Sequence, residues 1–153
     1  MRFGKNPAIW HVWSLKNIAL VATGGFFGTL ARALFDLLEQ NLPLDWLVVP
    51  WSTAIVNVLG AFLLGFIAGR AARARERRIS SVFDKYYLLF GTGFMGSFTT
   101  FSSFALAMSN SAQGPSLSAI VEGGAIIALG LAAATSGLLC GQIGLSWLIR
   151  VRD

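Results

Sequence analysis

The sequence predicts an all-α membrane protein, and three observations support this fold class. Of the 153 residues, 55% are hydrophobic and only 12% are charged, whereas about 25% of the residues of a soluble domain carry a charge. Several apolar stretches reach the roughly 20 residues that a spanning helix needs. These stretches are too long and too uniformly apolar for buried strands. The length is that of one domain, so residues 1–153 are expected to form a single integral membrane domain.

Four transmembrane helices per chain are expected. The predicted spans are residues 18–38, 51–69, 86–108 and 117–148. Pro50 precedes the second span, at a helix start where proline is tolerated. The fourth span is long enough to tilt or to extend beyond the hydrocarbon layer. Aromatic residues gather near the span ends, as in an aromatic belt: Trp10, Trp13, Trp46, Trp51, Tyr86, Tyr87 and Trp147.

The basic residues predict the orientation of these spans. Eleven of the 12 Lys and Arg residues lie within residues 1–17, 70–85 and 150–152, which four spans would place on one side. The opposite segments, residues 39–50 and 109–116, contain none. The positive-inside rule therefore predicts that both termini lie in the cytoplasm, with the chain in the cell's inner (plasma) membrane. Attraction to anionic membrane lipid explains the basic loop better than nucleic acid does.

A polar cluster interrupts the third apolar stretch. Residues 97–103 read SFTTFSS and follow Gly91, Gly93 and Gly96. So many hydroxyls cannot all bond to carbonyls of their own helix without straining it, and a break near the middle of the third helix is predicted. Broken helices occur at membrane depth where they line a cavity, and their freed carbonyls can hold a cation.

Other residues have two possible roles. Phe90, Phe94, Phe98, Phe101 and Phe104 recur at helical spacing, so one stripe is expected. Such a stripe is usually packing, yet the positive ring edges could face a small anion. Asn57, in an apolar span, could form an interhelical hydrogen bond or serve as a donor in a permeation path. Arg32, four residues before Asp36, suggests a structural interfacial role. No nucleophile–base pair is visible, so an enzyme is not expected.

Three segments resemble the Fluc (CrcB) fluoride channel family: "TGFMGSFTTFSSF", "GGFFGTLAR" and "TAIVNVLGAFLLG". The first is close to the family signature TGF-x-G-G-x-TTFSTF, and the resemblance covers all four spans. It implies passive export of cytoplasmic fluoride, which lowers its toxicity. It also implies an antiparallel dimer with two fluoride pores at the interface and a structural, non-transported sodium ion (Na+) between the subunits.

The resemblance also assigns roles to individual residues. The main-chain carbonyls of Gly96 and Thr99 would bind sodium. The fluoride pore would be lined by Asn57, Phe101, Phe104, Ser102, Ser103 and Thr135. The chain departs from the family pattern at Ser97, where a second glycine is common, at Ala107, where glutamate is common, and at Leu131, where serine is common.

Two questions stay open on the sequence. The one-sided basic charge favours a single orientation, and hence a heterodimer with an oppositely oriented Fluc-type subunit, over a dual-topology homodimer. A small multidrug-type exporter or a non-conducting membrane scaffold is the alternative function. Such an exporter would need an embedded glutamate in its first span, whereas Glu122 stands near the start of the fourth. A scaffold would have no need of the hydroxyl cluster.

Overall fold

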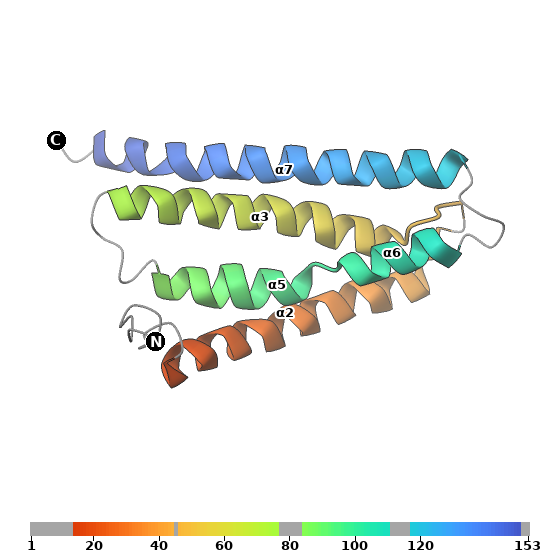
Figure 1. Ribbon diagram of the computed structural model, residues 1–153, viewed down its shortest axis with the longest axis horizontal. Coiled ribbons are helices and arrows are strands. Elements are labelled where there is room, and N and C mark those ends of the chain that lie inside the picture. The colour runs from red at the N-terminus through yellow and green to blue at the C-terminus, as the bar shows by residue number, and fades with distance from the viewer. Residues whose placement is uncertain (1–13, 45, 77–83, 111–116, 151–153) are drawn as a thin grey trace, which may run out of the picture.

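The computed structural model describes residues 14–44, 46–76, 84–110 and 117–150, and these residues are predominantly helical. The elements in chain order are α2 (Leu15–Asn41), α3 (Trp51–Glu76), η1 (Tyr87–Met95), α5 (Gly96–Phe98), α6 (Phe101–Asn110) and α7 (Leu117–Arg150). They lie roughly side by side along one long axis, and the start of α2 is at the same end as the last turns of α7 (Figure 1). The all-helical prediction is confirmed.

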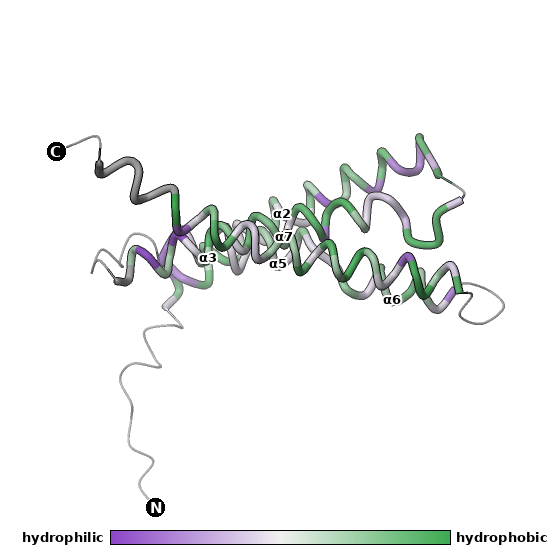
Figure 2. The backbone as a smooth tube through the Cα atoms, turned by 90° about the horizontal axis from the view of Figure 1, so that it is seen from above, coloured by the Kyte–Doolittle hydropathy of each residue, from purple (hydrophilic) through white to green (hydrophobic). Residues whose placement is uncertain are grey.

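Three helices are long and apolar enough to cross a membrane: Leu15–Asn41, Trp51–Ala74 and Leu117–Ile143. Within the most apolar window of the first and last of these, only 11% of the residues are buried inside the chain. Most of these apolar side chains therefore face outward, as in a protein surrounded by lipid. Figure 2 shows hydrophobic segments along the middle of the chain and hydrophilic ones mostly toward its two ends. The chain is a multi-pass membrane protein.

The third predicted span has a different structure from the other three. Its residues are divided among η1, α5 and α6, so no single helix there has the length of a span. Together these elements run beside α3 and α2 (Figure 1). A fourth crossing of the membrane stays a prediction.

The end of the bundle where α3 and α7 begin is fixed by two carboxylates. Glu39, in α2, accepts a hydrogen bond from Trp51 N at 2.9 Å, at the first residue of α3. Glu122, in α7, accepts hydrogen bonds from Val48 N at 3.1 Å and Val49 N at 2.7 Å. Carboxylates stabilise the free N–H groups near a helix start. These contacts hold the loop before α3 against both neighbouring helices.

Glycines allow the helices to pack with their backbones in close approach. A Cβ atom on Gly24 or Gly28 of α2 would collide with the backbone of Leu89 or Phe94. A Cβ atom on Gly93 would lie 2.6 Å from the Val21 carbonyl oxygen. This is the small-residue packing typical of membrane helices, and it brings η1, which is wound as a π-helix, directly against α2.

Arg32 lies in α2, where its Nε is 4.0 Å from the Asp36 carboxylate. Both side chains are partly exposed, so the pair adds little stability. Its interfacial role stays a prediction. Five of the basic residues lie outside the described residues, and there the charge distribution rests on the sequence alone: Arg2, Lys5, Arg77, Arg78 and Arg152.

Candidate functional site

The helical path between η1 and α6 is interrupted at Thr99 and Thr100. Thr99 is extended, with φ −78° and ψ 155°. Its N–H and its Oγ1 both donate to the Met95 carbonyl, at 3.1 Å and 2.9 Å, and so complete the last turn of α5. Thr100 Oγ1 accepts a hydrogen bond from Ser103 N at 3.2 Å, the usual N-cap contact, at the start of α6. The two threonines therefore end one helix and begin the next.

Asn57, in α3, binds this interruption through both ends of its amide. Its Nδ2 donates to the Thr100 carbonyl and its Oδ1 accepts from Thr100 N, each at 2.8 Å. These bonds satisfy the two main-chain groups of a residue that is only 8% exposed. The interhelical hydrogen bond, one of the two roles open for Asn57 on the sequence, is thus present. A second N–H of the amide has no hydrogen-bond partner among the described residues.

A cavity of about 260 Å³ opens beside the interruption. Its lining residues are Asn57, Thr99, Thr100, Phe101, Phe104, Ile126, Ile127 and Gly130. None of these side chains is charged, so the polar groups facing the cavity are amide, hydroxyl and main-chain groups. Such a cavity can bind a small ion through dipoles without a fixed opposite charge.

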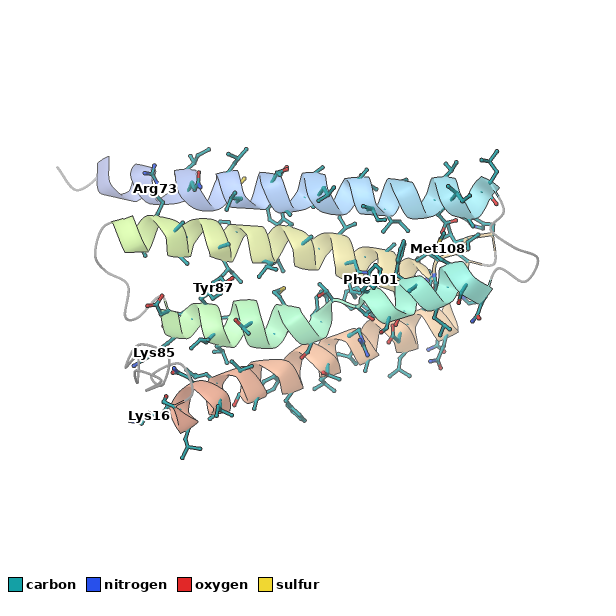
Figure 3. The ribbon with its side chains drawn as sticks, in the orientation of Figure 1. Lys16, Arg73, Lys85, Tyr87, Phe101 and Met108 are labelled. Carbon is teal, nitrogen blue, oxygen red and sulfur yellow. The ribbon has the colours of Figure 1, made fainter. Side chains whose placement is uncertain are left out.

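The two phenylalanines of the cavity have different environments. Phe101, at the start of α6 (Figure 3), is 78% exposed, whereas Phe104 is 9% exposed. Their ring centroids are 6.0 Å apart, with the planes tilted by 39°. Phe104 is therefore fixed by packing within the chain, and Phe101 projects from it.

The predicted single stripe of phenylalanines is wrong. Phe98, 3% exposed, lies in the core with Val56 and Met95, and its ring packs against Phe94 at 5.7 Å and Phe35 at 5.9 Å. The extended backbone of Thr99 breaks the helical register, so spacing across it no longer indicates a common face. Phe98 is a core residue, and the Phe101–Phe104 pair belongs to the cavity.

The structure brings together four of the predicted site residues in the cavity: Asn57, Thr99, Phe101 and Phe104. The two serines are linked to it through Thr100 Oγ1, which lies 3.1 Å from Ser102 Oγ and 3.2 Å from Ser103 Oγ. Thr135, on α7, is outside the lining, and its hydroxyl donates to the carbonyls of Leu131 and Ala132.

Gly96 also lies outside the cavity lining. It is exposed, and a Cβ atom built on it would meet nothing within 4 Å. Gly96 is the first residue of the short helix α5, and Thr99 follows its last residue. No cluster of three His, Cys, Asp or Glu side chains that could hold a metal occurs in the part of the chain that the structure describes.

Four lining residues were not among the predicted site residues: Thr100, Ile126, Ile127 and Gly130. Thr100 could have been found as a helix start, because threonine is one of the favoured N-cap residues. The two isoleucines carry no such signal, since the sequence does not distinguish an apolar residue that lines a cavity from one that faces lipid.

The fold and the cavity define a class of protein: a multi-pass membrane protein whose uncharged cavity lies at an interruption between two helices. A family model described as "CrcB-like protein, Camphor Resistance (CrcB)" matches residues 19–138. The chain belongs to the CrcB family, and the resemblance seen in the sequence is confirmed.

Similar proteins carry one recurring name. A protein of Bacillus thuringiensis subsp. konkukian, named fluoride-specific ion channel FluC 2, is 46% identical over 88 residues, which are 57% of this chain and 64% of the relative. One of Hyphomonas neptunium, named fluoride-specific ion channel FluC, is 34% identical over 126 residues, 81% of this chain and 94% of the relative. The chain thus spans slightly less than two thirds of the first relative and nearly all of the second.

Proposed function

We propose that this chain is a subunit of a fluoride-selective ion channel that exports cytoplasmic fluoride passively. The observation that carries the proposal is the uncharged cavity at Thr99 and Thr100, lined by the Asn57 amide and the rings of Phe101 and Phe104. The names of the relatives from Bacillus thuringiensis and Hyphomonas neptunium give the ion. The reaction is transport and not catalysis.

The cavity has suitable chemistry for a dehydrated anion. Removing water from fluoride is unfavourable unless donors are already in place. The second N–H of Asn57 and the positive ring edges of Phe101 and Phe104 supply such groups. The lining contains no carboxylate to repel fluoride and no lysine or arginine to retain it. The two serines and Thr135 would extend the polar path beyond this cavity.

Downhill transport is sufficient for the task. Fluoride enters cells as neutral HF from acidic surroundings and dissociates inside. A membrane potential that is negative inside then drives the anion out, so no coupling acid is needed. Glu122, a possible coupling acid for an exporter, already accepts two backbone hydrogen bonds from Val48 and Val49. This favours a channel over a proton-coupled exporter.

A structural sodium ion would be held by the carbonyls of Gly96 and Thr99 and by the same groups of a second subunit. Carbonyls at a helix interruption are suitable ligands for a hard monovalent cation. The open space beside Gly96 agrees with this arrangement, because its own chain leaves room for another backbone to approach. The ion would be structural and would not be transported.

The functional unit would be an antiparallel dimer with four passes per subunit and both termini of this chain in the cytoplasm. The basic residues Lys16, Arg73 and Lys85 lie at one end of the bundle (Figure 3), while residues 39–50, at the other end, contain no lysine or arginine. Such asymmetry favours one orientation. A heterodimer with an oppositely oriented Fluc-type subunit is therefore preferred to a dual-topology homodimer.

Fluoride efflux from liposomes tests the function. The purified chain is reconstituted alone and together with a candidate second subunit, and fluoride release is followed with a fluoride electrode under a potassium gradient with valinomycin. Fluoride release without chloride release in either preparation supports the proposal. Folded, correctly reconstituted dimers that release no fluoride contradict it.

Cysteine labelling tests the orientation. Cys140, which is exposed on α7, is first replaced. Single cysteines are then placed in residues 39–50 and 70–85 and labelled in whole cells with an impermeant reagent. Labelling of only the 39–50 segment is expected. Comparable labelling of both segments means dual topology and rejects the obligate heterodimer.

A further inference from the structure

A second cavity, of about 170 Å³, lies between α3 and η1, away from the interruption. Its lining residues are Phe66, Ile67, Arg70, Ala71, Tyr86, Tyr87 and Phe90. Tyr87 lies between α3 and η1, toward the end of the bundle that carries Arg73 and Lys85 (Figure 3). A cavity of about 150 Å³ is enough to take up benzene. This one therefore has room for part of a hydrocarbon chain.

Arg70 is the charged residue of this lining. Its guanidinium carbon lies 5.9 Å from the centroid of the Phe66 ring. Within the described residues Arg70 is in no ion pair, and the ring contact leaves its N–H donors available for an anion. A guanidinium close to apolar walls gains more from an oxyanion than it would in water.

The lining changes from charged to apolar along the axis of α3. Arg70 lies about 9 Å before the end of α3, at the helical rise of 1.5 Å per residue. Phe66 and Ile67 are one turn deeper in the bundle. Tyr86 and Phe90, whose rings stack at 6.4 Å, form the opposite wall and remain 55% and 45% exposed. An occupant would need an anionic group at Arg70 and an apolar part directed toward the middle of the bundle.

We propose that this cavity binds one anionic phospholipid, with a phosphate oxygen on Arg70 and an acyl chain between α3 and η1. The occupant is identified by charge and by polarity together. A free phosphate would leave the aromatic walls unfilled, and a zwitterionic lipid has weaker attraction to an end of the protein where basic residues gather. The site is separate from the proposed fluoride path and does not depend on it.

Native mass spectrometry of the full chain in detergent tests the proposal. The protein is mixed with equal amounts of phosphatidylglycerol and phosphatidylcholine, and the lipid that stays bound is identified. The wild type should retain phosphatidylglycerol in preference to phosphatidylcholine. Arg70→Gln should reduce that preference about tenfold, because a hydrogen-bonded charged contact is lost. Lys85→Gln, at an exposed basic residue outside the lining, is the matched control and should retain it.

A second variant separates the acyl chain from the headgroup. Ala71→Leu fills the cavity without changing the charge, and it should reduce the retention of both lipids. Each variant is also checked by its helical circular dichroism. If Arg70→Gln does not fold, Arg70→Lys replaces it, since lysine keeps the charge but not the planar fork of donors. A partial loss of preference is then expected.

Several results would overturn the proposal. Equal losses in Arg70→Gln and Lys85→Gln would mean diffuse surface attraction without a site. Unchanged lipid retention in Ala71→Leu would mean that no chain enters the cavity. A wild-type dimer that retains neither lipid would mean that a second copy covers this surface.

Discussion

Replacing Asn57 by leucine removes a polar contact between α3 and the interrupted helix while keeping a side chain of similar size. Both hydrogen bonds to Thr100 are lost, and the N–H and C=O of a residue that is 8% exposed are left without these partners. Interhelical hydrogen bonds in membranes average about 0.6 kcal/mol each. A buried group left unsatisfied costs about 1–3 kcal/mol.

For the N–H and the C=O of Thr100 together, these values give a loss of unfolding free energy between about 1 and about 6 kcal/mol. Thr100 also lines the cavity, where water can replace part of the lost bonding. The free energy of unfolding should therefore fall by about 1–3 kcal/mol, in the lower part of that range. It is measured by denaturing the full chain with SDS in lipid bicelles and following its helical circular dichroism.

Thr23→Val is the matched control for Asn57→Leu. Thr23 is exposed on α2, and its hydroxyl bonds only to the Ala19 carbonyl of its own helix at 2.8 Å. Its replacement should change stability by no more than about 0.5 kcal/mol. If Asn57→Leu and Thr23→Val unfold at the same SDS concentration, the amide does not hold the interruption in place, and the reasoning fails.

Fluoride efflux measured on the same Asn57→Leu protein distinguishes the two roles of the amide. A lost donor to an anion is worth about 1.5–3 kcal/mol, which corresponds to a decrease in flux of about tenfold or more. A decrease in flux without a decrease in stability would make Asn57 a pore donor and not a structural contact.

The remaining predictions concern the cavity, the helix packing and the second subunit. Phe101→Ile should lower fluoride efflux but leave stability nearly unchanged, because the ring is 78% exposed, whereas Phe104→Ile should lower both efflux and stability. If efflux is unchanged in both folded variants, the two rings serve only in packing. Gly93→Ala should lower the unfolding free energy by about 1–3 kcal/mol, because the added Cβ atom would collide with α2. Gly130→Ala is the control and should not lower it, because a Cβ atom there would meet nothing within 4 Å. Equal unfolding curves for the two variants would contradict the close approach of η1 to α2. Gly96→Val should leave the chain folded, abolish the dimer on size exclusion and remove any sodium dependence of its melting temperature, and a stable dimer with unchanged sodium dependence would count against the cation site.

The helical character of the chain could be predicted from the sequence because it depends on local composition. Long apolar stretches with few charges have one stable solution in lipid, the helix, which satisfies its backbone groups internally. The predicted starts at residues 51 and 117 coincide with those of α3 and α7. The helix ends were less accurate, since α2 and α3 continue to Asn41 and Glu76 beyond the apolar residues that define the spans.

The cavity could be predicted only in part. On the basis of a family resemblance, Asn57, Phe101 and Phe104 were expected to line a pore and Thr99 to bind sodium, and the structure places all four in one cavity lining. The order of the phenylalanines along the chain suggested a single stripe, which the interruption at Thr99 divides. Helical spacing predicts a common face only while the helix is continuous.

By itself, the sequence determined the membrane class, most of the helical segments and the gathering of the basic residues in three segments of the chain, because each of these follows from residue type and local order. The tertiary structure decided what the polar groups bind. Asn57 and Thr100 are 43 residues apart in sequence and Glu122 and Val49 are 73 apart, yet both pairs are hydrogen-bonded. Such contacts depend on how closely glycine-lined helices approach and on the rotation of one helix relative to another. Those quantities come from the packing of the whole bundle and have no local signature in the sequence.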